Sequence, residues 1–382
     1  MTSRERVWKA LNHKEPDRIP VDLGGNSSGM TDIAYRNLTH YLGIKNHDTT
    51  FSEWRTVENF DKRVLELLNI DICVVHIGQP GGYKPIDYSG SSSGIIENEW
   101  GIRRKNIGDY SQIVHNPLGD STINDLKNFH WPDPFDPRRV WGLHEKAKKL
   151  FENTDYAIKL ADPMGLFNGI SCMLRGFEEF MLDLVTNEKF VFALVEKELE
   201  LLIGFYGSAL DAVGQYIQIV ETSDDYGMQN GPMFSPSLYK KFFKKAHRKL
   251  NDFIKSKTRA KILFHSCGSV RAFIPDFIDA GIDILNPIQP SAADMNLKEI
   301  KKEFGKYLCF HGGIDVQRVL SGGLKEIEEN IKETIRIMSI GGGYILAPTH
   351  NIQPDISPGN IIAMYKYARK HGEYPIETNV VS

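Results

Sequence analysis

The residues best suited to bind a metal ion are His265 and Cys267, within the segment Phe264–Gly268. Side chains two residues apart on an extended segment project to the same side, and imidazole and thiolate are preferred zinc donors. Gly268 allows the chain to turn tightly after them. Catalytic zinc typically has three protein ligands and one open position. We predict His350, in a loop that follows an apolar run, as the third ligand.

Carboxylates follow another apolar run, in the segment Glu221–Gln229. If that run is the strand beside the His265 strand, its carboxylates can reach the metal or a metal-bound substrate. We therefore predict catalytic roles for Glu221 and Asp225, with a carboxylate of this loop as a candidate fourth ligand. For Asp224, a solvated loop or a helix cap is an equal alternative.

Further polar residues stand at the ends of other apolar runs. We predict a catalytic role for His76 and substrate binding by Asp162, Asn286 and His311. For the two histidines, a structural role at the rim of the fold remains the alternative.

The elements that position these residues alternate along nearly the whole chain. Short apolar, β-branched runs indicate buried strands, and longer amphipathic stretches between them indicate helices. Ser235-Pro236 and Ser357-Pro358 offer a capping hydroxyl followed by proline, which is typical of a helix start. Eight strand–helix alternations predict an α/β fold, a (β/α)8 barrel whose active site lies at the carboxyl ends of the strands. The predicted strands are Arg18–Leu23, Asp71–Ile77, Tyr156–Asp162, Tyr216–Glu221, Lys261–His265, Ile282–Pro287, Tyr307–His311 and Tyr344–Pro348.

One region interrupts the alternation. Residues 79–137 contain two extended pieces, around Ile95–Ile102 and Tyr110–His115, and end in a proline-rich stretch. We predict a long insertion after the second strand that arches over the barrel mouth, as a substrate lid or equally as a solvated excursion. Residues 1–382 are then predicted to form a single domain.

Composition narrows the class of protein. The 382 residues carry 46 basic and 49 acidic side chains, a net charge of −3, which argues against nucleic-acid binding. No apolar run reaches the roughly 18 residues of a membrane span, and the N-terminal residues lack an apolar signal core. A cytoplasmic protein without a membrane partner is expected. The four cysteines show no close pairing, so no disulfide framework is predicted.

Several segments resemble the uroporphyrinogen decarboxylase superfamily. They are Thr2–Val21, Leu174–Phe180, Ser235–Tyr239 and Gly342–Pro348. The resemblance extends over nearly the whole chain and implies the same barrel. Within this superfamily, His265-x-Cys267-Gly268 is similar to the zinc motif of the methylcobamide:coenzyme M methyltransferases.

The resemblance also implies a reaction. In those methyltransferases a cysteine after the last strand completes the zinc site, whereas this chain has His350 there. The segment Thr349–Gln353 looks more like superfamily members proposed to demethylate methoxylated small molecules with a corrinoid protein. This implies zinc-dependent methyl transfer between a small methylated compound, a methyl ether being favoured, and a corrinoid. The chain contains no corrinoid-binding Asp-x-His-x-x-Gly pattern, so the corrinoid is predicted to arrive on a partner protein.

A decarboxylase-type lyase is the alternative function. The decarboxylases of the family hold substrate carboxylates with an arginine-rich segment after the first strand. Here the corresponding segment, Leu23–Met30, has no arginine, and the next one is Arg36. A substrate with many carboxylates requires a cluster of guanidinium groups, so methyl transfer is the favoured prediction. The sequence does not indicate the methylated substrate, the direction of transfer or the oligomeric state.

Overall fold

The structure is a computed structural model of the 382-residue chain. It describes all residues except 27, 46–48, 82–85, 88–93, 109 and 378–382.

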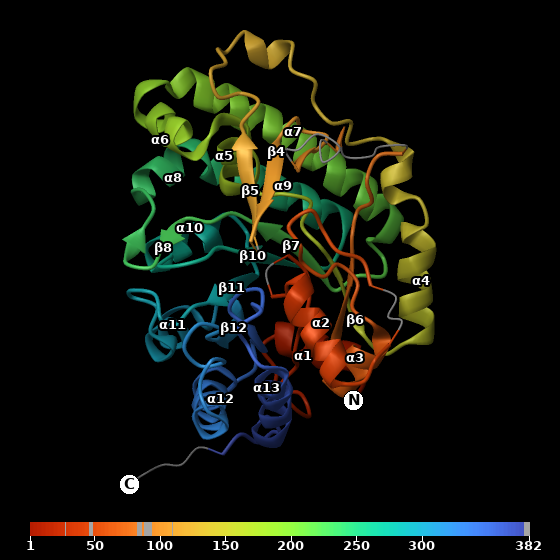
Figure 1. Cartoon of the computed structure of the whole chain (residues 1–382). Coiled ribbons are helices and arrows are strands. Elements are labelled where there is room, and N and C mark those ends of the chain that lie inside the picture. The colour runs from red at the N-terminus through yellow and green to blue at the C-terminus, as the bar shows by residue number, and fades with distance from the viewer. Residues whose placement is uncertain (27, 46–48, 82–85, 88–93, 109, 378–382) are drawn as a thin grey trace.

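A curved parallel sheet forms the centre of the molecule (Figure 1). Its seven strands are nearly continuous buried apolar runs, as expected for strands covered by helices. Consecutive strands along the chain are neighbours in the sheet, in the order β1-β6-β7-β10-β11-β12-β13. The strands are β1 (Ile72–Val75), β6 (Ala157–Leu160), β7 (Ile219–Ser223), β10 (Lys261–His265), β11 (Ile284–Ile288), β12 (Cys309–Ile314) and β13 (Tyr344–Pro348).

The prediction of a first strand at Arg18–Leu23 was wrong, since the described residues contain seven strands of this sheet. The segment instead lies between β13 and β1 and forms backbone hydrogen bonds with β13 and with the residue that precedes β1. The N–H of Asp22 donates to Leu346 O at 3.0 Å, and the N–H of Asp71 donates to Val21 O at 3.0 Å. Regular pairing fails because Pro20 has no N–H, and because the N–H of Val21 donates to the carboxylate of Asp71 instead.

The helices lie around the outside of the sheet (Figure 1). Ser235 and Ser357 cap α8 and α13 as predicted, each followed by proline at the first helical position. The helical stretch from Pro236 to Lys257 is divided at Phe243 into α8 and α9. The α-helices are α1 (Ser3–Leu11), α2 (Asp32–Tyr41), α3 (Lys62–Leu67), α4 (Leu143–Asn153), α5 (Cys172–Arg175), α6 (Phe177–Thr186), α7 (Glu188–Val213), α8 (Pro236–Phe242), α9 (Lys244–Lys257), α10 (Ile274–Asp279), α11 (Leu297–Phe304), α12 (Leu324–Met338) and α13 (Pro358–His371).

Shorter helical turns connect some of these elements. Three are 3₁₀ turns, Asp125–Lys127, Pro137–Val140 and Arg271–Phe273, and one is a π-helix, Leu166–Ser171.

One layer of apolar side chains seals the amino end of the sheet. Each strand contributes one buried residue to it, and Val7 and Leu11 of α1 pack against the layer from below. Helix α1 therefore closes this end, leaving the carboxyl ends of the strands for a site. The strand residues of the layer are Ile72, Ala157, Ile219, Leu263, Ile284, Cys309 and Ile345.

The chain between β1 and β6 forms a separate antiparallel sheet of four strands. The segment after it packs on α5, where Asn116 Nδ2 donates to Met173 O at 2.7 Å and the N–H of Leu118 donates to Leu174 O at 2.8 Å. That the region 79–137 is an insertion arching over the mouth stays a prediction, and part of it lies outside the described residues. The strands are β2 (Ile86–Asp87), β3 (Ile95–Glu97), β4 (Arg103–Ile107) and β5 (Tyr110–His115); a further pair is β8 (Gly227–Met228) and β9 (Gly231–Pro232).

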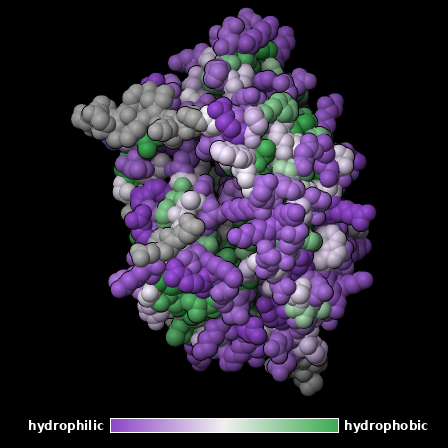
Figure 2. All heavy atoms as spheres, turned by 90° about the vertical axis from the view of Figure 1, so that its right-hand side faces the viewer, coloured by the Kyte–Doolittle hydropathy of each residue, from purple (hydrophilic) through white to green (hydrophobic). Residues whose placement is uncertain are grey.

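Hydrophilic side chains cover most of the face that Figure 2 shows, with hydrophobic residues in limited patches. Within the described part of the chain, none of the helices combines the length and the apolar character that crossing a membrane requires.

Candidate metal centre

A second interior layer, two residues further along each strand, is largely polar. Side chains alternate between the two faces of a strand, so these positions face the same interior as the apolar layer below them. They are Val74, Lys159, Glu221, His265, Asn286, His311 and Ala347. All but Val74 are buried. Polar side chains in such a place require partners, and they form the floor of the candidate site.

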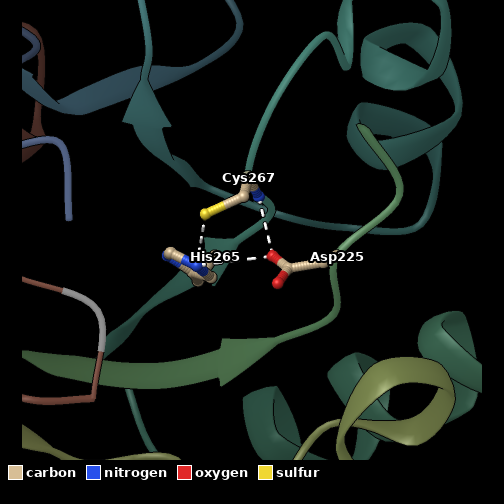
Figure 3. A group of neighbouring side chains, drawn as sticks. All are labelled: Asp225, His265 and Cys267. Carbon is tan, nitrogen blue, oxygen red and sulfur yellow. Dashed lines mark hydrogen bonds and ion pairs between the residues drawn. The ribbon is translucent and has the colours of Figure 1, made fainter. Parts of the chain in front are cut away.

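Asp225, His265 and Cys267 converge at the carboxyl ends of β7 and β10 (Figure 3). One ligand atom from each lies within 4.8 Å of the others. The Sγ atom of Cys267 is 3.2 Å from His265 Nε2, and Asp225 Oδ1 is 3.4 Å from the same nitrogen. The backbone N–H of Cys267 also donates to Asp225 Oδ1 at 2.8 Å. A nitrogen, a sulfur and an oxygen donor therefore face one another.

Two glycines allow the loops that carry these residues to meet. A Cβ on Gly268 would lie 2.4 Å from the backbone of Gly227, and Gly268 has φ +82°. A Cβ on Gly227 would lie 2.6 Å from Cys267 O. The backbones are thus in direct contact, and the N–H of Ser269 donates to Met228 O at 2.9 Å. Only glycine fits this approach at both positions, which brings Asp225 beside Cys267.

The neighbouring carboxylates have different tasks. Asn168 Nδ2 donates to Asp225 Oδ2 at 3.0 Å and orients that carboxylate. Asp224 instead accepts the N–H groups of Phe167 at 2.9 Å and Asn168 at 2.8 Å, at the start of the π-helix. Asp224 is therefore the cap of a helical turn, the structural alternative that the sequence left open.

The electrostatic environment keeps the thiol of Cys267 protonated. Burial raises its pKa well above the ordinary value, and the negative charge of Asp225 raises it further. A cation between the three groups would reverse this effect, because a metal ion stabilises the thiolate that binds it.

His350 follows β13, and its side chain is exposed. Desolvation by the surrounding protein lowers its pKa, the charge of His265 lowers it further, and Asp225 opposes the shift. His350 thus stands close enough to interact electrostatically with two members of the triad. It does not belong to the group of donors within 4.8 Å that the described residues form.

A chain of hydrogen bonds runs from His265 across the polar layer. His265 Nδ1 is 2.6 Å from Asn286 Oδ1, and Asn286 Nδ2 is 2.7 Å from His311 Nδ1. His311 Nε2 is 2.9 Å from Asp22 Oδ2, which also accepts from Lys159 Nζ at 2.6 Å. Asn286 and His311, predicted to bind substrate, thus lie directly behind the triad.

The other predicted site residues lie around this network. Glu221 is fully buried and accepts the N–H of Asn26 at 3.3 Å. His76 Nε2 is 2.9 Å from Glu58 O, and burial lowers the pKa of His76 while Glu58 opposes the shift.

Asp162 lies in a buried cluster at the end of β6. Its carboxylate accepts hydrogen bonds from Tyr206 Oη at 2.9 Å and from Ser223 Oγ. Burial raises the pKa of Asp162 to about 7 although these hydrogen bonds oppose the shift.

Sequence reasoning missed two residues of the network. Lys159 lies within the otherwise apolar strand Ala157–Leu160. A charged residue in such a run was the signal that could have identified it. Asn168, the partner of Asp225, lies in the π-helix Leu166–Ser171, and no sequence pattern distinguishes it.

Comparison with solved structures shows the same fold elsewhere. A methyltransferase from Methanosarcina mazei matches with a TM-score of 0.63 at 16% identity, over 97% of this chain and 99% of that chain. A B12-independent methionine synthase from Shewanella sp. W3-18-1, in complex with selenomethionine, matches with a TM-score of 0.50 at 13% identity, over 92% of this chain and 98% of that chain. At such identities the likeness establishes the fold alone.

Sequence comparison assigns the family. No curated protein matches the chain. The family model described as uroporphyrinogen decarboxylase (URO-D) matches residues 120–371, which hold β6 to β13 and therefore the triad. The chain belongs to the uroporphyrinogen decarboxylase family.

Proposed function

We propose that this protein is a zinc-dependent methyltransferase that moves a methyl group between a small methylated compound and a corrinoid carried by a partner protein. A methyl ether is the favoured class of methylated compound. The observation that carries the proposal is the convergence of Asp225, His265 and Cys267 at the carboxyl ends of the strands in a chain of this family.

The donor set suits zinc better than other common cations. Magnesium and calcium take oxygen ligands, whereas zinc binds imidazole, thiolate and carboxylate. His265 and Cys267 are the proposed ligands, with Asp225 or His350 as the third and the other as a candidate fourth. When bound, zinc would act as a Lewis acid that makes the oxygen of a methyl ether a better leaving group.

The chain's own residues hold the site in place. The N–H of Cys267 and Asn168 Nδ2 fix the carboxylate of Asp225 from two sides. Asn286 fixes the ring of His265 through Nδ1, which directs Nε2 toward the other two donors. We further propose Glu221 and His76 as catalytic residues and Asp162, Asn286 and His311 as substrate-binding residues, with the open end of the sheet as the docking face of the corrinoid protein.

A second candidate is a metal-free carboxy-lyase, which the family match itself favours. In the polar layer, however, the charge of Lys159 is paired with Asp22. A lyase for a polycarboxylate would need further cations at the mouth. A metal analysis separates the two functions, because the lyase needs no zinc.

The test combines metal content with methyl transfer. We expect about one zinc per chain in protein purified without chelator. Cys267→Ala should lose both metal and activity, while Cys309→Ala, which removes a thiol from the apolar layer, should keep both. Transfer to a cognate corrinoid protein should greatly exceed transfer to free cobalamin, because docking supplies proximity. Protein without transition metal, or equal rates with both acceptors, would contradict the corresponding part of the proposal.

The third ligand can be identified by two substitutions. If His350 is the third ligand, His350→Ala loses zinc and Asp225→Asn retains most of it; if Asp225 is, the pattern is reversed. His40→Ala, at an exposed position of α2, is the control for removal of a surface histidine. All three variants should remain folded, because surface changes alter stability by within about 0.5 kcal/mol and Asp225 lies in a loop.

A further inference from the structure

We propose that the buried ion pair between Lys159 and Asp22 sets the tautomer of His265, acting through His311 and Asn286. In this tautomer Nδ1 carries the proton and Nε2 presents its lone pair to Cys267 and Asp225. Lys159 and Asp22 are thus positioning residues of the metal centre. The inference rests on the proposed function only for the identity of the bound metal.

The ion pair determines which group donates and which accepts in the hydrogen bonds that follow. Lys159 Nζ donates to Asp22 Oδ2 at 2.6 Å and to Gly24 O at 3.0 Å, and both charged side chains are at most 1% exposed. Burial alone would lower the pKa of Lys159, but Asp22 and Glu221 raise it above the ordinary value. Burial alone would raise the pKa of Asp22, but Lys159 and His311 hold it below the ordinary value. Asp22 is therefore a carboxylate, which can only accept hydrogen bonds.

His311 transmits this direction. Its Nε2 lies 2.9 Å from Asp22 Oδ2, so Nε2 must carry the proton that it donates. Burial lowers the pKa of His311, although Asp22 opposes the shift, so the ring is neutral at pH 7. A neutral imidazole with a proton on Nε2 has an acceptor at Nδ1.

Asn286 can satisfy this acceptor in one orientation of its amide. Its Nδ2 lies 2.7 Å from His311 Nδ1 and 3.4 Å from His311 O. The carbonyl oxygen can only accept, so both contacts require the NH₂ group on this side. Asn286 Oδ1 then faces His265 Nδ1 at 2.6 Å and accepts its proton.

The last step reaches the metal-binding atom. A neutral imidazole with its proton on Nδ1 has its lone pair on Nε2, and in His265 that atom lies 3.2 Å from Cys267 Sγ and 3.4 Å from Asp225 Oδ1. The opposite tautomer would point a proton into the triad and exclude a cation. Outer partners of a ligating histidine typically change metal affinity 10- to 100-fold.

The substitution Asp22→Asn tests the chain at its far end. An amide lacks the negative charge that holds the proton on His311 Nε2, so the preference for a proton on His265 Nδ1 is weakened along the same hydrogen bonds. We expect zinc affinity, measured by competition with a chelator, to fall 10- to 100-fold in this variant. Asp71→Asn is the matched control. Asp71 is fully buried and paired with Arg6 and Arg18, and it takes no part in the hydrogen bonds that lead to His265. That variant should bind zinc as the wild type does.

Nitrogen NMR of the metal-free wild type measures the tautomers directly. This measurement does not depend on whether an Asp22 variant folds. In protein labelled with ¹⁵N-histidine, we expect the Nδ1–H tautomer for His265 and the Nε2–H tautomer for His311, assigned with His265→Gln and His311→Gln. The Nε2–H tautomer on His265 overturns the inference.

The affinity measurement separates the inference from the proposed function. Unchanged zinc affinity in folded Asp22→Asn overturns the role of the ion pair. If Asp22→Asn does not fold, His311→Leu cuts the same chain nearer the site, and unchanged affinity in that variant has the same meaning. Wild-type protein with the expected tautomers but no zinc affinity would contradict the proposed function and support the inference.

Discussion

Two layers of side chains fill the interior of the sheet, two residues apart along each strand, and they differ in chemical character. The lower layer is built from aliphatic residues and one cysteine, and α1 closes it with Val7 and Leu11. The upper layer holds Lys159, Glu221, His265, Asn286 and His311, and each of them contacts another polar group. The same strands carry both layers. The first inward-facing position of each strand is apolar, and the next one is polar in most strands.

The difference separates stability from chemistry within one sheet. Apolar burial in the lower layer stabilises the fold without specifying partners. Each polar group of the upper layer is tolerated only with its particular partner, because a buried charge without one is strongly destabilising. Changes in the lower layer should therefore alter stability alone, whereas changes in the upper layer should also alter the metal centre.

The largest effect is expected from removing the cation of the upper layer. Lys159→Met leaves Asp22 buried without its counter-charge and removes the cation that interacts with Glu221. We expect a loss of about 3–5 kcal/mol in the free energy of unfolding, as for other broken buried pairs, measured by urea denaturation.

The control is a lysine of the surface. Lys257 forms an exposed ion pair with Asp211, so Lys257→Met should change stability by less than about 1 kcal/mol. Similar losses in the two variants would mean that the upper layer does not depend on specific pairing.

The next effect concerns the contact between the two glycines. Gly268→Ala places a side chain at φ +82° and within 2.4 Å of the Gly227 backbone. We expect about 1–3 kcal/mol of backbone strain and, as the loops separate, loss of zinc. Gly231→Ala, in β9, is the control because a Cβ there meets nothing within 4 Å. Full zinc occupancy in Gly268→Ala would show that the close approach is not needed for the triad.

The sequence predicted those features that depend on local periodicity. Seven of the eight predicted strands are confirmed, because buried apolar runs have a clear signature. The pair His265 and Cys267 follows from the period of two of an extended segment. Asp225 was anticipated from the adjacency of its strand to that of His265. These predictions needed no knowledge of the register between distant strands.

Features that depend on register could not be predicted. Whether Lys159 faces the interior or the helices is decided by its alignment with Ile219 of β7, which no local pattern encodes. The failure at Arg18–Leu23 has a similar origin, since the Asp71 carboxylate that takes the N–H of Val21 lies 50 residues away in the chain.

A smaller effect, dependent on pH, is expected from Asp162 at the edge of the upper layer. Its pKa of about 7 in the folded protein lies above the ordinary value of 3.8, so the folded state binds the proton more tightly than the unfolded state. Its contribution to stability is complete below about pH 4 and is lost as pH rises toward about 7. The slope is up to about 1.4 kcal/mol per pH unit for one proton. Asp162→Asn should remove this slope, seen as flatter unfolding free energies between pH 5 and 7; an unchanged slope would contradict it.

The smallest effect tests the independence of the two layers most directly. Ile284 lies in the apolar layer, two residues before Asn286 on β11, and Ile345 occupies the same layer on β13, two residues before Ala347. Ile→Val at either position removes one buried methylene group and should cost about 0.5–1.5 kcal/mol. Because apolar packing does not select hydrogen-bond partners, zinc affinity should stay within about twofold of wild type in both variants. A tenfold loss of zinc affinity in Ile284→Val but not in Ile345→Val would show that the packing below Asn286 helps to hold the hydrogen-bond chain, and the two layers would then act as one unit on that strand.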